Sequence, residues 1–148
     1  MELSYVMVKP EFANKPEVIA IVKKEIAKRG FKIIEESFIK YGKEEAQSHY
    51  AEHFNGSYEN AKPFYKGLED YITSDIAYGM VVEGKDVKAK MREMIKELRQ
   101  AIPAFLGQEP DGRKNVLHGS DLTPNSEVNE IKIFRKLAKE NNSDIVLD

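Results

Sequence analysis

The amino-acid sequence predicts an α+β fold, a ferredoxin-like β-α-β-β-α-β sandwich on a four-stranded antiparallel sheet. Short apolar runs that suit buried strands alternate with segments whose apolar residues recur at helical spacing. A pair of polar, helix-prone segments interrupts this order once and predicts an inserted helical hairpin. The 148 residues show no internal repeat and no linker, so we expect a single domain over residues 1–148.

The first elements alternate between strand and helix. Residues 3–8 form a short buried strand. A helix follows with Asn14 as its cap and Pro16 in its first turn, and it ends at Gly30. The second strand covers residues 31–41, where apolar side chains return after that glycine.

The inserted pair of helical segments covers residues 43–54 and 61–72. An apolar strand over 76–82 comes next. The apolar spacing over 87–98 then predicts an amphipathic helix, which we expect Pro103 to stop.

The last third of the chain is less regular. No period is visible over residues 104–121, which predicts a loop. Thr123 and Pro124 restart a short helix, residues 131–134 suit a last strand, and 136–142 suit a closing helical turn. The helices are expected to cover one face of the sheet.

The composition excludes several classes of protein. The absence of Cys removes disulfide scaffolds, thiolate metal sites and cysteine nucleophiles. The 23 basic residues nearly balance 25 acidic ones and are spread along the chain, so no specific nucleic-acid partner is expected, although a local positive pocket is possible. There is no apolar run of the ~20 residues that a membrane span requires. Glu2 stands where a signal peptide needs basic residues, so we expect no membrane partner and a cytoplasmic protein.

Two of the three histidines form a short motif. His49-Tyr50-Ala51-Glu52-His53 fits the H-x-x-E-H pattern of inverted zinc peptidases, with both imidazoles on one helix face. The pattern also requires a third ligand and a substrate cleft. A solvated helix face is the simpler interpretation, and no metal-binding residues are assigned.

The third histidine lies in a different setting. Asn115-Val116-Leu117-His118-Gly119-Ser120-Asp121 falls in the aperiodic stretch, where a loop leaves an imidazole accessible. Gly119 lets a ligand approach the backbone closely. By itself this segment fits a reactive histidine and a locally bonded one equally well.

This heptapeptide, with Lys9-Pro10 after the first strand, closely resembles the nucleoside diphosphate kinase family. Further matches follow in order over nearly the whole chain, and they are His49 to His53, Lys62-Pro63-Phe64-Tyr65, Gly67-Leu68, Tyr71 to Ser74, Val82-Glu83-Gly84, Arg92 and Glu130-Ile131. The family carries the H-x-x-E-H run without zinc.

The resemblance implies a ping-pong kinase with His118 as the nucleophile. The imidazole would take the γ-phosphate of a nucleoside triphosphate, become a phosphohistidine, and pass the phosphoryl group to a nucleoside diphosphate. Mg²⁺ is implied as the cofactor, held mainly by the nucleotide phosphates. The partners are then nucleoside tri- and diphosphates, together with further copies of the chain in a hexamer, tetramer or dimer.

The resemblance also assigns supporting residues. Nucleotide binding would fall to Lys9, Phe64, Leu68, Arg92 and Asn115. Phe64 would stack on the base with Leu68 beside it. Three further residues would support the histidine, with Tyr50 bordering it, Glu130 fixing its tautomer and Ser120 holding that glutamate.

The segment between Arg92 and His118 departs from the family pattern and is about four residues shorter. Leu98 stands at the offset of a phosphate-binding Thr, and Phe105 at that of a phosphate-binding Arg. Arg99 or Arg113 would have to replace that charge, and we favour Arg99. Asp111 or Gly112 replaces an apolar residue that closes on the base. The alternative function is therefore a weakened or inactive nucleotide-binding or assembly module derived from this family.

Overall fold

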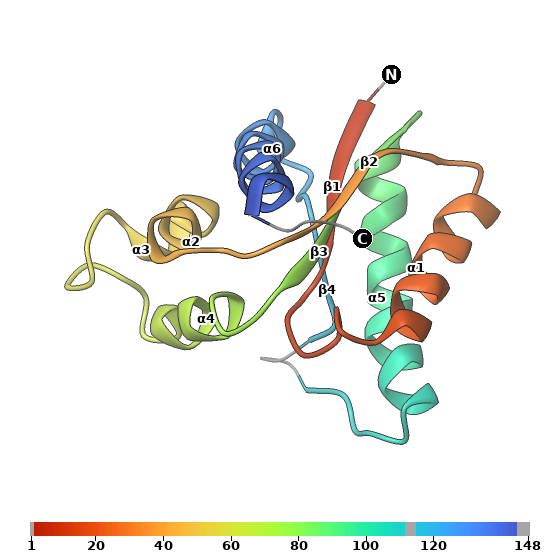
Figure 1. Cartoon of the computed structure of the whole chain (residues 1–148), viewed down its shortest axis with the longest axis horizontal. Coiled ribbons are helices and arrows are strands. Elements are labelled where there is room, and N and C mark those ends of the chain that lie inside the picture. Colours follow the sequence, from red (N-terminus) through yellow and green to blue (C-terminus); the bar gives the residue numbers. More distant parts are fainter. Residues whose placement is uncertain (1, 112–114, 145–148) are drawn as a thin grey trace.

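The structure, a computed structural model, describes residues 2–111 and 115–144. Its centre is a four-stranded antiparallel sheet with strand order β2-β3-β1-β4 (Figure 1). The strands are β1 (Glu2–Val8), β2 (Lys32–Ile39), β3 (Ala77–Gly84) and β4 (Leu117–Gly119). This sheet, with a helix between β1 and β2 and another between β3 and β4, confirms the predicted fold class.

Helices cover both faces of the sheet, so the expectation of one covered face is wrong (Figure 1). One face carries α1 (Pro16–Lys28) and α5 (Val87–Phe105). The other carries α6 (Ser126–Asp144) and the inserted α2 (Lys43–His49), α3 (Ala51–Phe54) and α4 (Tyr65–Ile72). The cause is visible in β1, where Val6 and Val8 enter one core while Tyr5 and Met7 enter the other.

The chain after β3 contains the remaining corrections. Residues 131–134 belong to helix α6 and not to a strand, because Ile131, Phe134 and Leu137 pack one helical face against the sheet. The last strand is β4, which is too short at three residues for its period to show in the sequence. The helix after Thr123 and Pro124 begins at Ser126.

Helix α5 continues past Pro103 to Phe105. A proline this close to a helix end removes only one of the last hydrogen bonds, so it does not stop the helix at once. Gly107, with φ +72°, adopts the left-handed conformation that turns the chain away. None of the helices within the described residues has the length and apolar character needed to cross a membrane.

Candidate active site

His118 lies on the edge strand β4, directly opposite Met7 of β1. Because side chains alternate along a strand, this register turns His118 toward the face covered by α6, while its neighbour Leu117 enters the other core. There Nε2 of His118 lies 2.5 Å from Oε2 of Glu130, the charged partner that α6 supplies. The histidine side chain remains 20% exposed, so it is held firmly and is still reachable.

Ser120 ties this pair to the sheet. Its hydroxyl donates to Oε1 of Glu130 over 2.6 Å and accepts from the backbone N–H of Tyr5 over 2.9 Å. The backbone N–H of Ser120 in turn donates to the carbonyl of Tyr5. Both oxygens of the Glu130 carboxylate therefore have a partner, and its position is fixed relative to β1.

An aromatic cluster surrounds the histidine on the α6 side. The ring of His49, at the end of α2, lies 4.5 Å from the ring of His118 and 4.7 Å from that of Tyr50. Tyr50 itself lies 6.5 Å from His118, so the residue expected beside the histidine is there. Burial, with smaller effects of the nearby cations, holds the pKa of His49 well below its ordinary value and keeps that imidazole neutral.

Lys9, directly after β1, is almost fully buried near the same strand edge. Its ammonium donates to Oδ1 of Asn115 over 2.5 Å, and its backbone N–H donates to the carbonyl of Val116. Burial, and secondly the charge of Arg99, lowers the pKa of Lys9 to about 8. The ammonium is therefore charged at neutral pH at a cost that a bound anion would offset.

Arg99 of α5 contacts the strand that carries the histidine. Its Nε and Nη2 both donate to the carbonyl of Leu117, over 3.2 and 2.9 Å. Burial, followed by the charge of Arg92 about two helical turns earlier in α5, lowers the pKa of Arg99. Among the described residues no carboxylate forms an ion pair with Lys9, Arg92 or Arg99.

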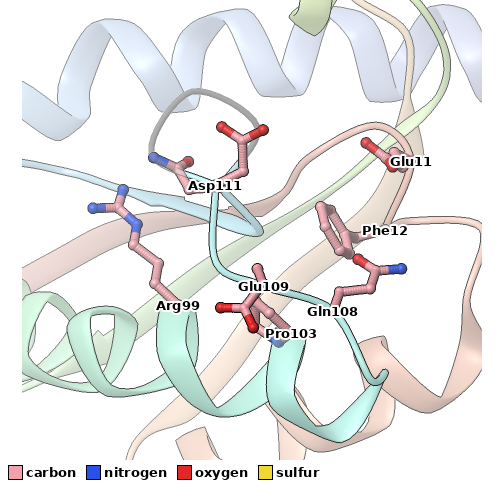
Figure 2. Close-up of a pocket in the computed structure, with 8 residues that line it drawn as sticks. Glu11, Phe12, Arg99, Pro103, Gln108, Glu109 and Asp111 are labelled. Atoms are coloured by element: carbon pink, nitrogen blue, oxygen red, sulfur yellow. The ribbon is translucent and has the colours of Figure 1, made fainter.

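Arg99 lines two hollows. The first, of about 130 Å³, is lined by Glu11, Phe12, Asp111, Asn115 and residues at the end of α5, and Figure 2 shows Arg99 rising toward it from the helix. The second, of about 410 Å³, lies along α5 and reaches Gly119, with Arg92, Lys96 and Arg99 in its lining. Cations that form no ion pair with a carboxylate of the described residues, close to an accessible histidine, suit a ligand with several negative oxygens.

The inserted helices form the other side of the site. Phe64 caps α4 and is 51% exposed, with its ring 5.9 Å from the Lys62 ammonium and 5.1 Å from the ring of His53. Leu68 lies one turn later and packs partly against the core. The hydroxyl of Tyr71 donates to the carbonyl of Pro10, which fixes α4 to the loop that carries Lys9.

The residues named in the shortened segment between Arg92 and His118 lie in different environments. Leu98 is buried in the core, so it cannot replace a phosphate-binding hydroxyl. Phe105 ends α5 and is 62% exposed. Asp111 lines the smaller hollow, whereas Arg113 and Gly112 lie outside the described residues.

Sequence reasoning missed His49 as a neighbour of His118. The signal is present in the H-x-x-E-H run, but helical spacing predicts a solvated face for its two histidines. In the structure the helix is interrupted at Tyr50, and the ligand atoms that meet those of His49 come from His118 and Glu130, not from His53. The arrangement gives no support to a zinc peptidase.

The fold and this chemistry together place the chain in the class of phosphotransferases. A family model described as nucleoside diphosphate kinase matches residues 2–139. The chain belongs to the nucleoside diphosphate kinase family. It therefore transfers the γ-phosphate of a nucleoside triphosphate to a nucleoside diphosphate, and no finding favours the alternative of an inactive module.

Individual relatives agree with this assignment. A nucleoside diphosphate kinase of Pelotomaculum thermopropionicum is 38% identical over 138 residues, which cover 90% of this chain and 87% of the relative. Among solved structures, the Aquifex aeolicus enzyme matches with a TM-score of 0.72 and 26% identity, covering 90% of this chain and 94% of its own. The Halobacterium salinarum enzyme, solved in complex with CDP, matches with a TM-score of 0.69 and 31% identity over 90% and 86% of the two chains.

Proposed function

We propose that His118 is the nucleophile of the kinase and that Nδ1 is its reacting atom. The observation that carries this proposal is the 2.5 Å contact between His118 Nε2 and Glu130. If the carboxylate accepts the Nε2 proton, the ring is held in the tautomer whose lone pair is on Nδ1. Within the described residues Nδ1 has no hydrogen-bond partner, so this lone pair is available for attack.

The transfer then takes two steps, phosphorylation of His118 and transfer from it to the acceptor. Nδ1 attacks the γ-phosphorus, the bond from that phosphorus to the β–γ bridging oxygen breaks, and the diphosphate leaves with the electron pair. Glu130 stabilises the positive charge that the phosphorylated ring carries. An oxygen of the acceptor diphosphate then attacks the same phosphorus, and the electron pair of the P–N bond returns to Nδ1.

Lys9, Arg92 and Arg99 supply the positive charge that the phosphates require. Arg99 takes the role left open by Phe105, because it lies beside the Leu117 carbonyl next to the histidine and has no carboxylate partner among the described residues. Its two hydrogen bonds to that carbonyl also position β4. Phosphoryl transfer depends mainly on such placement and charge.

The nucleoside end binds at the inserted helices. Phe64 offers a half-exposed ring on which any base can stack, with Leu68 beside it, and Asn115 receives the ribose hydroxyl. The CDP complex of the Halobacterium relative supports nucleotide binding by this chain. Tyr50 borders the reacting histidine.

Mg²⁺ enters with the nucleotide. Within the described residues no three carboxylates lie close enough together to hold a metal ion, so the protein offers cations for the phosphates and not an oxygen cage for the metal. The ion would be held by phosphate oxygens and water. When bound, it neutralises charge on the β- and γ-phosphates.

The chain is also proposed to form a homo-oligomer in the cytoplasm, where nucleoside triphosphates are abundant. Support comes from β2, an edge strand on which Ile34 and Phe38 are 38% and 40% exposed. Light scattering after size-exclusion chromatography distinguishes a dimer, tetramer or hexamer from a monomer.

A labelling experiment tests the assignment of the nucleophile. The purified chain is mixed with γ-labelled ATP and Mg²⁺, and a stable, base-resistant but acid-labile label is expected on the protein. Addition of unlabelled nucleoside diphosphate should remove the label as nucleoside triphosphate. The His118→Ala variant should take up none, with His53→Ala as the matched control that labels normally. Equal labelling of the His118→Ala variant would overturn the assignment.

A further inference from the structure

One imidazole of the H-x-x-E-H run has no polar partner. Both ring nitrogens of His49 are buried, and neither makes a hydrogen bond within the described residues. His53, the other histidine of the run, has its Nδ1 3.2 Å from the Lys62 ammonium. Buried polar atoms are rarely left unsatisfied in folded proteins, so the environment of His49 points to a ligand.

The surroundings of His49 indicate what that ligand is. Donor atoms of His49, His118 and Glu130 all lie within 4.8 Å of one another. The two imidazole rings are 4.5 Å apart and inclined at 61°. In the described part of the chain this is the only group of three or more such donors. They come from three elements, α2, β4 and α6, so the tertiary fold brings them together.

Two imidazole nitrogens and one carboxylate oxygen suit zinc and similar transition cations. Magnesium prefers oxygen ligands and does not suit this set. With Zn–N bonds of about 2.0–2.1 Å, neighbouring ligands of a tetrahedral ion are about 3.3 Å apart. Donor atoms up to 4.8 Å apart therefore need to approach one another by about 1.5 Å, whereas Nε2 of His118 and Oε2 of Glu130, at 2.5 Å, need to separate by about 0.8 Å. Side-chain rotation can supply both shifts.

We propose that His49, His118 and Glu130 form a binding site for a divalent transition cation of the zinc type. The cation takes the place of the proton between Nε2 of His118 and Glu130, and the neutral ring then carries its one proton on Nδ1. Water completes the fourth position. Because a protonated Nδ1 has no lone pair with which to attack, the bound cation blocks phosphoryl transfer, and this consequence alone rests on the proposed nucleophile.

Zinc binding is measured first, without nucleotide. The full-length chain is stripped with a chelator and titrated with Zn²⁺ against a chromophoric competitor. One zinc per chain is expected. His49→Gln should weaken binding by more than about 100-fold, since even the loss of an outer partner of a metal ligand costs 10–100-fold. His53→Gln, the matched control, should bind as the natural chain does, and far-UV circular dichroism checks that both variants fold.

A second measurement covers the case in which His49→Gln does not fold. Co²⁺ bound to the unaltered chain should give the intense visible absorption of a four-coordinate ion, and weak six-coordinate bands would overturn the proposal. So would the absence of bound zinc, or equal zinc affinity in the folded His49→Gln and His53→Gln variants.

Kinase assays then test the consequence. Zinc should inhibit the natural chain and His53→Gln equally, and a chelator should restore the rate. If the unaltered chain keeps its full kinase rate when it is saturated with zinc, zinc does not inhibit the kinase. Failure of the labelling experiment with normal zinc binding would count against the proposed nucleophile and leave the metal site standing.

Discussion

Glu130 on α6 and His118 on β4 meet at 2.5 Å, although the prediction of a strand over residues 131–134 would have placed Glu130 differently. Helix α6 packs Ile131 and Phe134 against the sheet, and this packing sets the position of the carboxylate beside the imidazole. The pair therefore depends on helix packing as well as on residue identity.

Glu130→Gln tests this relationship. The neutral amide cannot stabilise a positively charged ring and does not favour one tautomer, so the rate of phosphoenzyme formation should fall by about 10²-fold or more. Glu140→Gln, an exposed position on the same helix, is the control and should react normally. Single-turnover labelling measures both rates, and an unchanged rate in Glu130→Gln would show that the contact has no role in the chemistry.

The buried Lys9 predicts a pH dependence. Its pKa of about 8 means that its charge is lost as the pH rises through that value, well below the ordinary 10.5. Since kcat/KM reports the free enzyme, this ratio should fall above about pH 8. Lys9→Arg keeps the charge and should remove that decrease, and a profile identical to the natural one would contradict the assignment.

The same group affects folding stability with the opposite trend. The unfolded chain keeps the Lys9 proton up to its ordinary pKa of 10.5, whereas the folded chain releases it near 8. Between these values the unfolded state binds more protons, so the contribution of Lys9 to the free energy of unfolding rises with pH. Urea unfolding of the natural chain and Lys9→Met at pH 7.5 and 9.5 measures this difference, which should disappear in the variant.

Arg99 is predicted to contribute both charge and position. Arg99→Lys keeps the charge but loses the two hydrogen bonds to the Leu117 carbonyl. It should therefore lower kcat/KM, but by less than Arg99→Met does. Arg99→Met loses both and should lower it by about 10²–10³-fold. Arg135→Met removes an exposed arginine paired with Glu35 and is the control. If all three variants keep full activity, the missing phosphate contact is supplied elsewhere.

Two glycines give opposite predictions for stability. A Cβ at Gly79 of β3 would lie 2.6 Å from the ring of Phe134 and 2.8 Å from the Tyr5 hydroxyl, so Gly79→Ala should destabilise the fold by about 1–3 kcal/mol. At Gly67 of α4 nothing lies within 4 Å of the added carbon, and Gly67→Ala should stabilise by up to about 1 kcal/mol. Chemical denaturation compares the two, and a Gly79→Ala variant of unchanged stability would show that α6 packs less closely on the sheet.

The strands β1 to β3 and helix α1 could be predicted because each is long enough to show its own apolar pattern. The run from Leu3 to Val8 and the helix between Pro16 and Gly30 are of this kind. The three-residue β4 has no period of its own and is a strand only because β1 pairs with it. Residues 131–134 are apolar enough for a strand, and only the sheet face they pack against makes them helical.

The sequence by itself determined the fold class and the family and predicted a set of site residues, because these depend on local periodicity and on motifs that stay together along the chain. Tertiary structure decided what no local signal carries. It turned His49 toward His118, placed Arg99 against the Leu117 carbonyl with no carboxylate partner among the described residues, and covered both faces of the sheet. His49 and His118 are 69 positions apart in the chain, so their contact depends on how α2 packs beside β4 in the folded domain.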